Sequence, residues 1–265
     1  DYIDVQSDPE VWAKINNVSD DTIWNIKKEL KHKLTEYLKV KVVEDMQRRQ
    51  ESPSLIINTI ENFNENALII GFARRFATYK RAHLLFNNID RLAELLNNPE
   101  KPVVFLFAGK AHPNDKAGQD LIKMIIETSR RKEFAGKVMF LNNYDMELGK
   151  ILTSSVDIWM NTPTRPLEAS GTSGEKAVMN GTLNLSVLDG WWAEGYRKEA
   201  GWALQEERTY SDQRYQDELD AETIYNLIEN EIVSLYFDRN EKGVPTRWVQ
   251  YVKNDLMQIA PNYTM

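Results

Sequence analysis

A glycine-rich turn at residues 168–176 carries the side chains best suited to chemistry. It reads Glu-Ala-Ser-Gly-Thr-Ser-Gly-Glu-Lys, between an apolar segment at 156–160 and another at 177–179. This pattern predicts a strand, a loop and a short helix over 176–180. Amides at a helix start, unhindered at Gly171 and Gly174, attract phosphate or carboxylate groups. Lys176, expected in the first turn, would add an amine able to form a Schiff base. A surface loop with a solvated lysine is the alternative.

A second candidate segment is basic and follows the apolar residues 68–70. It reads Gly-Phe-Ala-Arg-Arg-Phe-Ala-Thr-Tyr-Lys-Arg over residues 71–81. The chain as a whole has 33 Lys and Arg against 40 Asp and Glu, a formal charge of −7, so this segment reverses the local sign. Such a reversal in a cleft would concentrate anionic ligands. The alternative is a charged loop before a helix that starts near Arg81.

Both segments resemble those of one enzyme family. Residues 165–192, RPLEASGTSGEKAVMNGTLNLSVLDGWW, closely resemble the cofactor-lysine segment of the α-glucan phosphorylases, which act on glycogen, starch and maltodextrin. The resemblance implies that Lys176 carries pyridoxal 5′-phosphate. It also implies that Thr172, Ser173 and nearby backbone amides hold the phosphate of that cofactor.

The same resemblance assigns the other site residues. It implies that Arg75 and Lys80 hold the substrate phosphate, while Arg74 and Tyr144 lie near the cofactor. Glu168 would accept hydrogen bonds from glucose hydroxyls. The backbone of the three residues after it would add further sugar contacts: Ala169, Ser170 and Gly171.

The sequence departs from the animal members of that family in the cofactor pocket. Asp145 stands where the animal enzymes have an arginine, and Glu175 replaces an uncharged residue before the lysine. Residues 144–146 and 189–192 resemble instead the shorter bacterial and archaeal branch. We therefore interpret Asp145 as a subfamily feature.

The order of apolar segments predicts the fold. Continuous apolar strands are expected at 68–72, 103–107, 138–141, 156–160 and 183–188, with helices at 81–96, 118–134 and 145–152 between them. Continuous rather than alternating apolar strands, separated by helices, indicate a doubly wound parallel α/β sheet. The resemblance identifies it as the C-terminal half of a GT-B-type glycosyltransferase. Ligands of such sheets bind at the carboxyl ends of the strands.

Three regions are expected along the chain. Residues 1–66 would form a helical lead-in that includes a helix at about 21–50, residues 67–210 the Rossmann-like cofactor and phosphate domain, and residues 211–265 helices that pack on it. Those last helices are expected at 224–237 and 246–259. The tryptophans at 191 and 192 would either form a sugar-stacking platform or lie in the core, and we expect the core.

Composition excludes several classes of site and partner. There is no cysteine, so disulfides and thiolate metal sites are excluded, and the three histidines are dispersed. No long apolar run or signal-peptide pattern occurs. We expect a cytoplasmic protein with no metal, nucleic acid or membrane partner. Because the chain begins with aspartate, we also expect a piece cut from something longer. The resemblance implies that this piece lacks an N-terminal domain and is inactive alone.

The resemblance implies reversible phosphorolysis of α-1,4-glucans by inorganic phosphate to release glucose 1-phosphate. The full enzyme would contain the missing N-terminal domain and could form a homodimer. Two alternatives stay open. A nucleotide-sugar glycosyltransferase of the glycogen or starch synthase kind would share the fold but leave Lys176 without a role, and a non-catalytic glucan-binding module would leave the basic segment unused.

Overall fold

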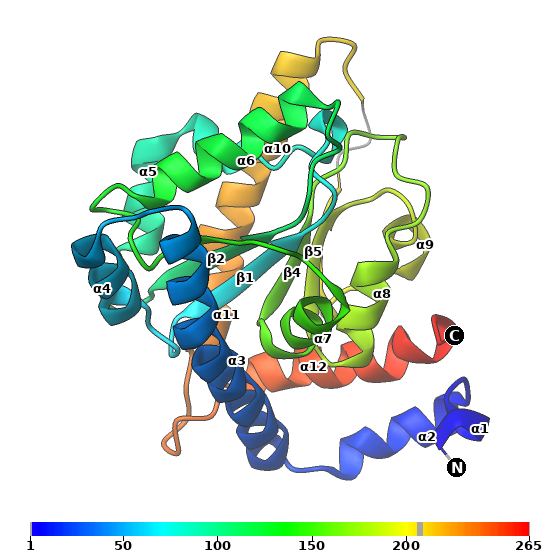
Figure 1. Cartoon of the computed structure of the whole chain (residues 1–265). Coiled ribbons are helices and arrows are strands. Elements are labelled where there is room, and N and C mark those ends of the chain that lie inside the picture. Colours follow the sequence, from blue (N-terminus) through cyan, green and yellow to red (C-terminus); the bar gives the residue numbers. More distant parts are fainter. Residues whose placement is uncertain (1, 206–208, 265) are drawn as a thin grey trace.

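A single sheet of six parallel strands forms the centre of the computed structural model, which describes residues 2–205 and 209–264 (Figure 1). The strand order is β3-β2-β1-β4-β5-β6. The strands are β1 Leu68–Ala73, β2 Val103–Ala108, β3 Val138–Leu141, β4 Ile158–Asn161, β5 Leu183–Val187 and β6 Trp202–Leu204. The predicted doubly wound α/β fold is therefore confirmed.

Helices cover both faces of the sheet, which explains why its strands are apolar throughout. Every residue of β1 and β2 is buried. Leu68, Ile70 and Phe72 of β1 belong to the core on one face, whereas Ile69 and Ala73 belong to the core on the other. The helices around these cores are α3 Asp20–Arg48, α4 Pro53–Asn62, α5 Ile89–Leu96, α6 Lys116–Ser129, α7 Met146–Ser155, α8 Thr172–Met179 and α10 Gln213–Leu227.

The two helix layers can be followed in Figure 1. Helices α3, α4 and α7 lie on one side of the sheet, and α5, α6 and α10 lie on the other. Helix α12, Thr246–Gln258, runs below α7 and α8 and packs its buried Trp248 and Val252 into the larger core. Of the described residues, no helix combines the length and the apolar character needed to cross a membrane.

Short polar side chains start several of these helices. The Ser19 hydroxyl accepts a hydrogen bond from the amide of Thr22, and the Asp115 carboxylate accepts one from the amide of Gly118. Such N-caps satisfy amides that lack an intrahelical partner. Asp145 has the same role at α7, where its carboxylate lies 2.8 Å from the amide nitrogen of Leu148.

The chain reverses direction across the sheet between β1 and β4. From β1 it passes outward to β2 and β3, and it then returns to place β4 on the other side of β1. In open parallel sheets, ligands bind at such a switch point, beyond the carboxyl ends of the two strands. The segments after β1 and β4 are therefore the first places to look for a site.

The prediction of a helix at 81–96 is wrong for the first half of that range. Arg81 has a left-handed backbone, with φ of 52°, and a short 3₁₀ turn at Leu84–Asn87 follows. The α-helix begins only at Ile89, where the Asn88 side chain accepts a hydrogen bond from the amide of Arg91. Long-range contacts of Arg81, described below, account for the break.

Two other elements differ from the expected ones. Strand β6 was not predicted, because three residues are too short for a periodic signal; it pairs with β5 through Leu185 and Trp202. The helix expected at 224–237 begins earlier, at Gln213, and continues through a π-helical segment at Ile228–Ile232 into α11, Val233–Phe237. Trp191 and Trp192 are buried, as the core reading predicted.

A buried ionic network lies at the opposite, amino-terminal end of the strands. The Lys31 ammonium of α3 is 2.6 Å from the Asp157 carboxylate and 2.6 Å from the Tyr236 hydroxyl. Asp157 also accepts a hydrogen bond from the backbone amide of Ile69. This network joins α3 and α11 to the start of β4, so it stabilises the sheet at the end away from the switch point.

Candidate active site

Two cations share one carboxylate at the switch point. The Lys80 ammonium lies 2.8 and 2.7 Å from the two carboxylate oxygens of Glu168, and Nη2 of Arg74 lies 2.6 Å from one of them. All three side chains are less than one tenth exposed. We call these residues the switch-point cluster. Because it holds two positive charges and one negative charge away from water, it is suited to attract an additional anion.

The loop after β1 positions both cations. The amide of Arg74 donates to the carbonyl of Ala108, and the amide of Phe76 donates to the carbonyl of Lys110, so this loop follows the end of β2. Gly109 permits that approach, since a Cβ atom there would lie 1.8 Å from the Arg74 carbonyl oxygen, and its φ is 149°. Lys80 ends a short 3₁₀ helix, Thr78–Lys80.

The loop after β5 positions Glu168. The Asp189 carboxylate accepts a hydrogen bond from the amide of Glu168 at 2.9 Å, and the amide of Trp191 donates to the carbonyl of Ser170 at 2.9 Å. The backbone of Ala169 and Ser170, expected to contact sugar, therefore lies between two anchors. The sequence analysis did not predict that Asp189 holds this loop.

Helix α8 begins earlier than predicted and changes the position of the candidate cofactor lysine. Its N-cap is Gly171, with φ of 97°, and its first residue is Thr172. Lys176 thus lies in the second turn and not in the first. Thr172 and Lys176 are four residues apart on one face, and both are exposed, whereas Ala177 and Val178 are buried.

The buried face of α8 is fitted closely to the loop after β5. A Cβ atom at Gly174 would lie 2.7 Å from Nε1 of Trp191 and 2.9 Å from the side-chain oxygen of Asn184. The Ser173 hydroxyl is 3.3 Å from Nε1 of Trp159, in β4. These contacts fix the rotation of α8 and so keep Thr172 and Lys176 on its open side.

The structure does not bring all the predicted residues together. Arg75 is exposed, and its guanidinium lies 3.4 Å from the Tyr79 hydroxyl, a weak contact. Lys176 is exposed as well, and within the described part of the chain no hydrogen bond or ion pair joins it to the switch-point cluster. Arg74, Lys80 and Glu168 therefore form a built site, while Arg75 and Lys176 are open to further ligands.

Two tyrosines lie beside the switch-point cluster. Burial raises the pKa of the Tyr144 hydroxyl, and the charge of Arg74 opposes that shift. Burial would also raise the pKa of Tyr79, but hydrogen bonds from Lys80 and Arg75 outweigh it and lower that pKa. The Lys80 ammonium is 4.8 Å from the centre of the Tyr79 ring, a cation–π distance. The charge of Arg74 therefore acts on the Tyr144 hydroxyl.

The open side of α8 fits an aldehyde that carries a phosphate group. The exposed amine of Lys176 leaves room for a Schiff-base partner, and the amides that begin α8 can receive an anion. Near this helix start, Asn161 ends β4, and its side-chain oxygen is buried without a hydrogen-bond partner among the described residues. Burial raises the pKa of the Glu175 carboxyl, with Lys176 opposing the shift.

Fold and cluster together define a class of protein, a parallel α/β sheet domain with buried cations at its switch point. Residues 8–201 match the family described as carbohydrate phosphorylase. The chain is 40% identical to the maltodextrin phosphorylase of Thermococcus litoralis over all of its own length, and 38% identical to the glycogen phosphorylase of Aquifex aeolicus over 99%. It is 36% identical to the glycogen phosphorylase of Mycobacterium tuberculosis over 96%. The chain belongs to the carbohydrate phosphorylase family. It spans 30%, 37% and 29% of these relatives, respectively.

Proposed function

We propose that this chain supplies the phosphate- and cofactor-binding half of an α-1,4-glucan phosphorylase. The complete enzyme would act in the cytoplasm and transfer a terminal glucose of glycogen or maltodextrin to inorganic phosphate, giving glucose 1-phosphate. The observation that carries the proposal is the switch-point cluster, two buried cations on one carboxylate, in a chain of this family. The rest of the active site would come from an N-terminal domain of the same polypeptide.

The cations would bind and orient the substrate phosphate. In this structure Arg74 and Lys80 both donate hydrogen bonds to the Glu168 carboxylate. An arriving phosphate would take over part of that contact, because guanidinium and ammonium groups bind oxyanions with charge-assisted hydrogen bonds. Arg75, which is exposed beside them, would complete the phosphate contacts. The resulting positive field would also stabilise negative charge that develops on the phosphate during transfer.

Glu168 would then be available to the sugar. A carboxylate released from one cation can accept hydrogen bonds from glucose hydroxyls, and a buried acceptor of this kind discriminates strongly against sugars that lack them. The anchored backbone of residues 169–171 would lie against the same sugar. Phosphate would in this way bind the two cations, whereas the glucan would bind the carboxylate that they release.

Lys176 would hold pyridoxal 5′-phosphate, with Thr172, Ser173 and the first amides of α8 around the phosphate of that cofactor. When bound, the cofactor would supply a phosphate that gives a proton to the substrate phosphate and takes it back. The role of Lys176 is that of a tether. Arg74 and Tyr144 would border this group, since Tyr144 already lies close to Arg74.

The test uses the complete polypeptide that contains this chain. With maltodextrin and inorganic phosphate it should form glucose 1-phosphate. Lys80→Ala should raise the KM for phosphate by about 100-fold or more, because one charged partner is worth several kcal/mol at a desolvated site, and it should change the KM for maltodextrin far less. Equal losses for both substrates would count against the phosphate role.

The competing glycosyltransferase reading predicts another donor. If the complete polypeptide binds a nucleotide sugar and elongates maltodextrin without pyridoxal phosphate, the synthase-like activity is correct and the phosphorylase proposal is wrong. A non-catalytic glucan-binding module would show neither reaction. Trp191 and Trp192 are buried, so they do not form the sugar-stacking platform that would have favoured a glucan-binding module.

A further inference from the structure

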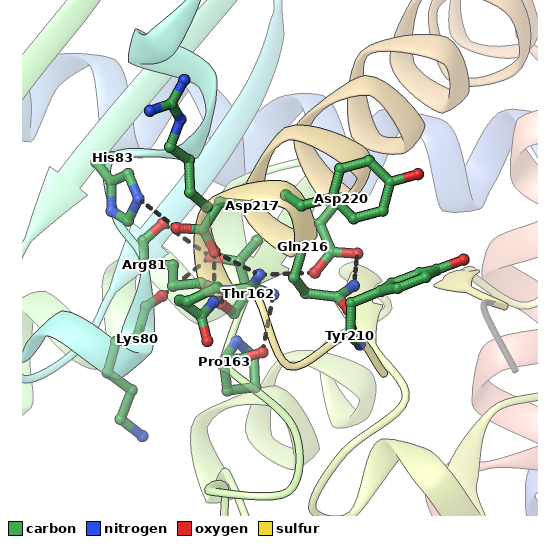
Figure 2. Close-up of polar contacts among 12 residues, drawn as sticks. Lys80, Arg81, His83, Thr162, Pro163, Tyr210, Gln216, Asp217 and Asp220 are labelled. Atoms are coloured by element: carbon green, nitrogen blue, oxygen red, sulfur yellow. Dashed lines mark hydrogen bonds and ion pairs between the residues drawn. The ribbon is translucent and has the colours of Figure 1, made fainter. Parts of the chain in front are cut away.

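A buried guanidinium next to the switch-point cluster has no part in the proposed chemistry. Arg81 is only 2% exposed. Its Nε donates to the carbonyl of Thr162 at 2.9 Å, and its Nη2 donates to the carbonyl of Pro163 at 3.0 Å. Its Nη1 lies 3.1 Å from Asp217 and 2.6 Å from Asp220, both on α10 (Figure 2). One side chain therefore joins the segment after β4 to helix α10.

The segment after β4 is in turn bonded to the backbone of Lys80. The Thr162 hydroxyl donates to the carbonyl of Lys80 at 3.0 Å, and the amide of Thr164 donates to the carbonyl of Tyr79 at 2.7 Å. Arg81 itself has a left-handed backbone, which costs a non-glycine residue about 1–2 kcal/mol. The strained conformation persists because these contacts hold residues 79–81 from both sides.

Helix α10 holds the guanidinium through two carboxylates that are themselves held. Asp217 also accepts hydrogen bonds from Gln213 at 2.6 Å and lies 3.1 Å from Nε2 of His83. Asp220 accepts a hydrogen bond from Gln216 at 2.9 Å. Figure 2 shows that these side chains surround the Arg81 head group, while the Lys80 amine points away from them. The arrangement therefore fixes the backbone of Lys80 and leaves its amine free for the site.

We infer that Arg81, held by Asp217 and Asp220, is a positioning residue that sets where the Lys80 ammonium meets substrate phosphate. This inference rests on the proposed function and extends it to α10, which contributes nothing to the switch-point cluster directly. A planar guanidinium can bond two carbonyls and two carboxylates at once, and an ammonium cannot reproduce that fork. Displacement of a binding group by about 1 Å can cost 100-fold in rate.

Arg91 of α5 is a matched control, because it also contacts α10. Its guanidinium lies 2.7 Å from Glu222 of α10 and 2.8 Å from Glu229 of the π-helical segment that follows α10. Its side chain has no bond to residues 74–81 or to the segment after β4 among the described contacts. Arg91→Lys therefore weakens a tie to α10 without touching the backbone of Lys80.

The experiment compares three variants of the complete polypeptide, each supplied with the cofactor. Arg81→Lys should raise the KM for inorganic phosphate about tenfold or more and leave the KM for maltodextrin within about twofold. Asp217→Asn, at a half-buried position, should give the same pattern more weakly. Arg91→Lys should change neither constant, even if it lowers stability. Amide hydrogen exchange should quicken at residues 79–81 and at Thr162 and Thr164 in Arg81→Lys but not in Arg91→Lys.

Each result decides the matter. If Arg81→Lys raises both KM values equally, or neither, Arg81 is a structural residue and the inference is wrong; the same holds if Arg91→Lys shows the phosphate-selective loss. If Arg81→Lys does not fold, the phosphate KM of Asp217→Asn decides. If the unmodified polypeptide forms no glucose 1-phosphate, the proposed function itself fails, and that result is distinct from an active enzyme in which Arg81→Lys behaves normally.

Discussion

Glu168 has two partners in this structure and a third in the proposed reaction. Its carboxylate pairs with both Arg74 and Lys80 and offsets one of their two positive charges, and such charges are costly to leave unpaired in a desolvated site. The phosphate that would displace it carries at least as much negative charge. Both cations therefore keep an anionic partner with and without substrate, which explains how they can remain buried before the substrate arrives.

Substitution of the neighbouring residues Arg75 and Arg74 should separate an effect on phosphate binding from an effect on stability. Arg75→Ala should weaken phosphate use but change the free energy of unfolding by no more than about 0.5 kcal/mol, because Arg75 is exposed and makes only a long contact to Tyr79. Arg74→Ala is the control, and it should cost about 3 kcal/mol by breaking a buried ion pair. Urea unfolding and phosphate kinetics measure both effects. A large stability loss in Arg75→Ala would contradict this account.

Much of the candidate site could be predicted at the residue scale, but not its internal contacts. Charge reversal around Arg74 and Lys80 and the glycine-rich turn after Glu168 are local signals, and both segments do follow strands at the switch point. The pairing of Glu168 with both cations joins residues about 90 positions apart and has no local signature. Arg81 was interpreted as the start of a helix for the same reason, since its partners lie in the segment after β4 and on α10.

At the scale of elements, the long helix α3 and the last helix α12 stabilise the sheet from its amino-terminal end. Lys27 of α3 donates to the carbonyls of Ser154 and Asn180, each at 3.1 Å, and its burial lowers its pKa to about 8. Asp255 of α12 is wholly buried, and neither of its carboxylate oxygens has a hydrogen-bond partner in the described part of the chain. Burial raises the pKa of Asp255 well above its ordinary value, with Lys27 opposing the shift.

Asp255 should therefore make stability fall as the pH rises. The folded state keeps a proton that the unfolded chain releases above about pH 4, so this contribution is complete at low pH and is lost as the pH rises toward the folded pKa. Asp255→Asn cannot titrate. The free energy of unfolding of Asp255→Asn is compared with that of the unsubstituted chain at the same pH. This difference should favour the variant more at pH 7.5 than at pH 4.5, by about 1.4 kcal/mol for each unit by which the pKa of Asp255 is raised within that range.

Urea unfolding at the two pH values measures this difference. Asp120→Asn, on the exposed side of α6, removes the same charge and is the control. Equal pH dependence in the Asp255 and Asp120 variants would show that the buried carboxyl does not behave as described.

Element types were predictable where the apolar pattern was long. The five strands expected from continuous apolar runs are all present, because a strand buried on both faces needs such a run. Boundaries failed where a cap or a distant contact decides them. Gly171 starts α8 through its left-handed backbone, four residues before the apolar pattern suggests, and Asn88 starts α5 after a turn that the helical spacing of leucines conceals.

At the scale of the whole molecule, the switch point collects loops from separate parts of the chain along one edge of the sheet. The curated relatives are about three times as long, and the exposed positions of Arg75 and Lys176 are where the remainder of a larger enzyme would complete the site. Of the residues proposed to bind substrate or cofactor, those already buried contact one another, whereas those open to solvent do not.

The isolated chain should accordingly be a poor catalyst. Residues 1–265, mixed with pyridoxal phosphate, maltodextrin and inorganic phosphate, should form glucose 1-phosphate at least about 100-fold more slowly than the complete polypeptide, because an incompletely assembled and hydrated site loses most of its electrostatic stabilisation. Enzymatic assay of released glucose 1-phosphate measures the ratio. Comparable rates would show that this chain contains the whole active site.

Chemical trapping can show whether the Lys176 amine binds pyridoxal phosphate, as we propose. The complete polypeptide, supplied with pyridoxal phosphate and reduced with borohydride, should carry a stable pyridoxyl phosphate group on the peptide that contains Lys176, and Lys176→Arg should carry none. Peptide mass spectrometry locates the group. An unmodified Lys176, or a group attached reproducibly to another lysine, would contradict the account.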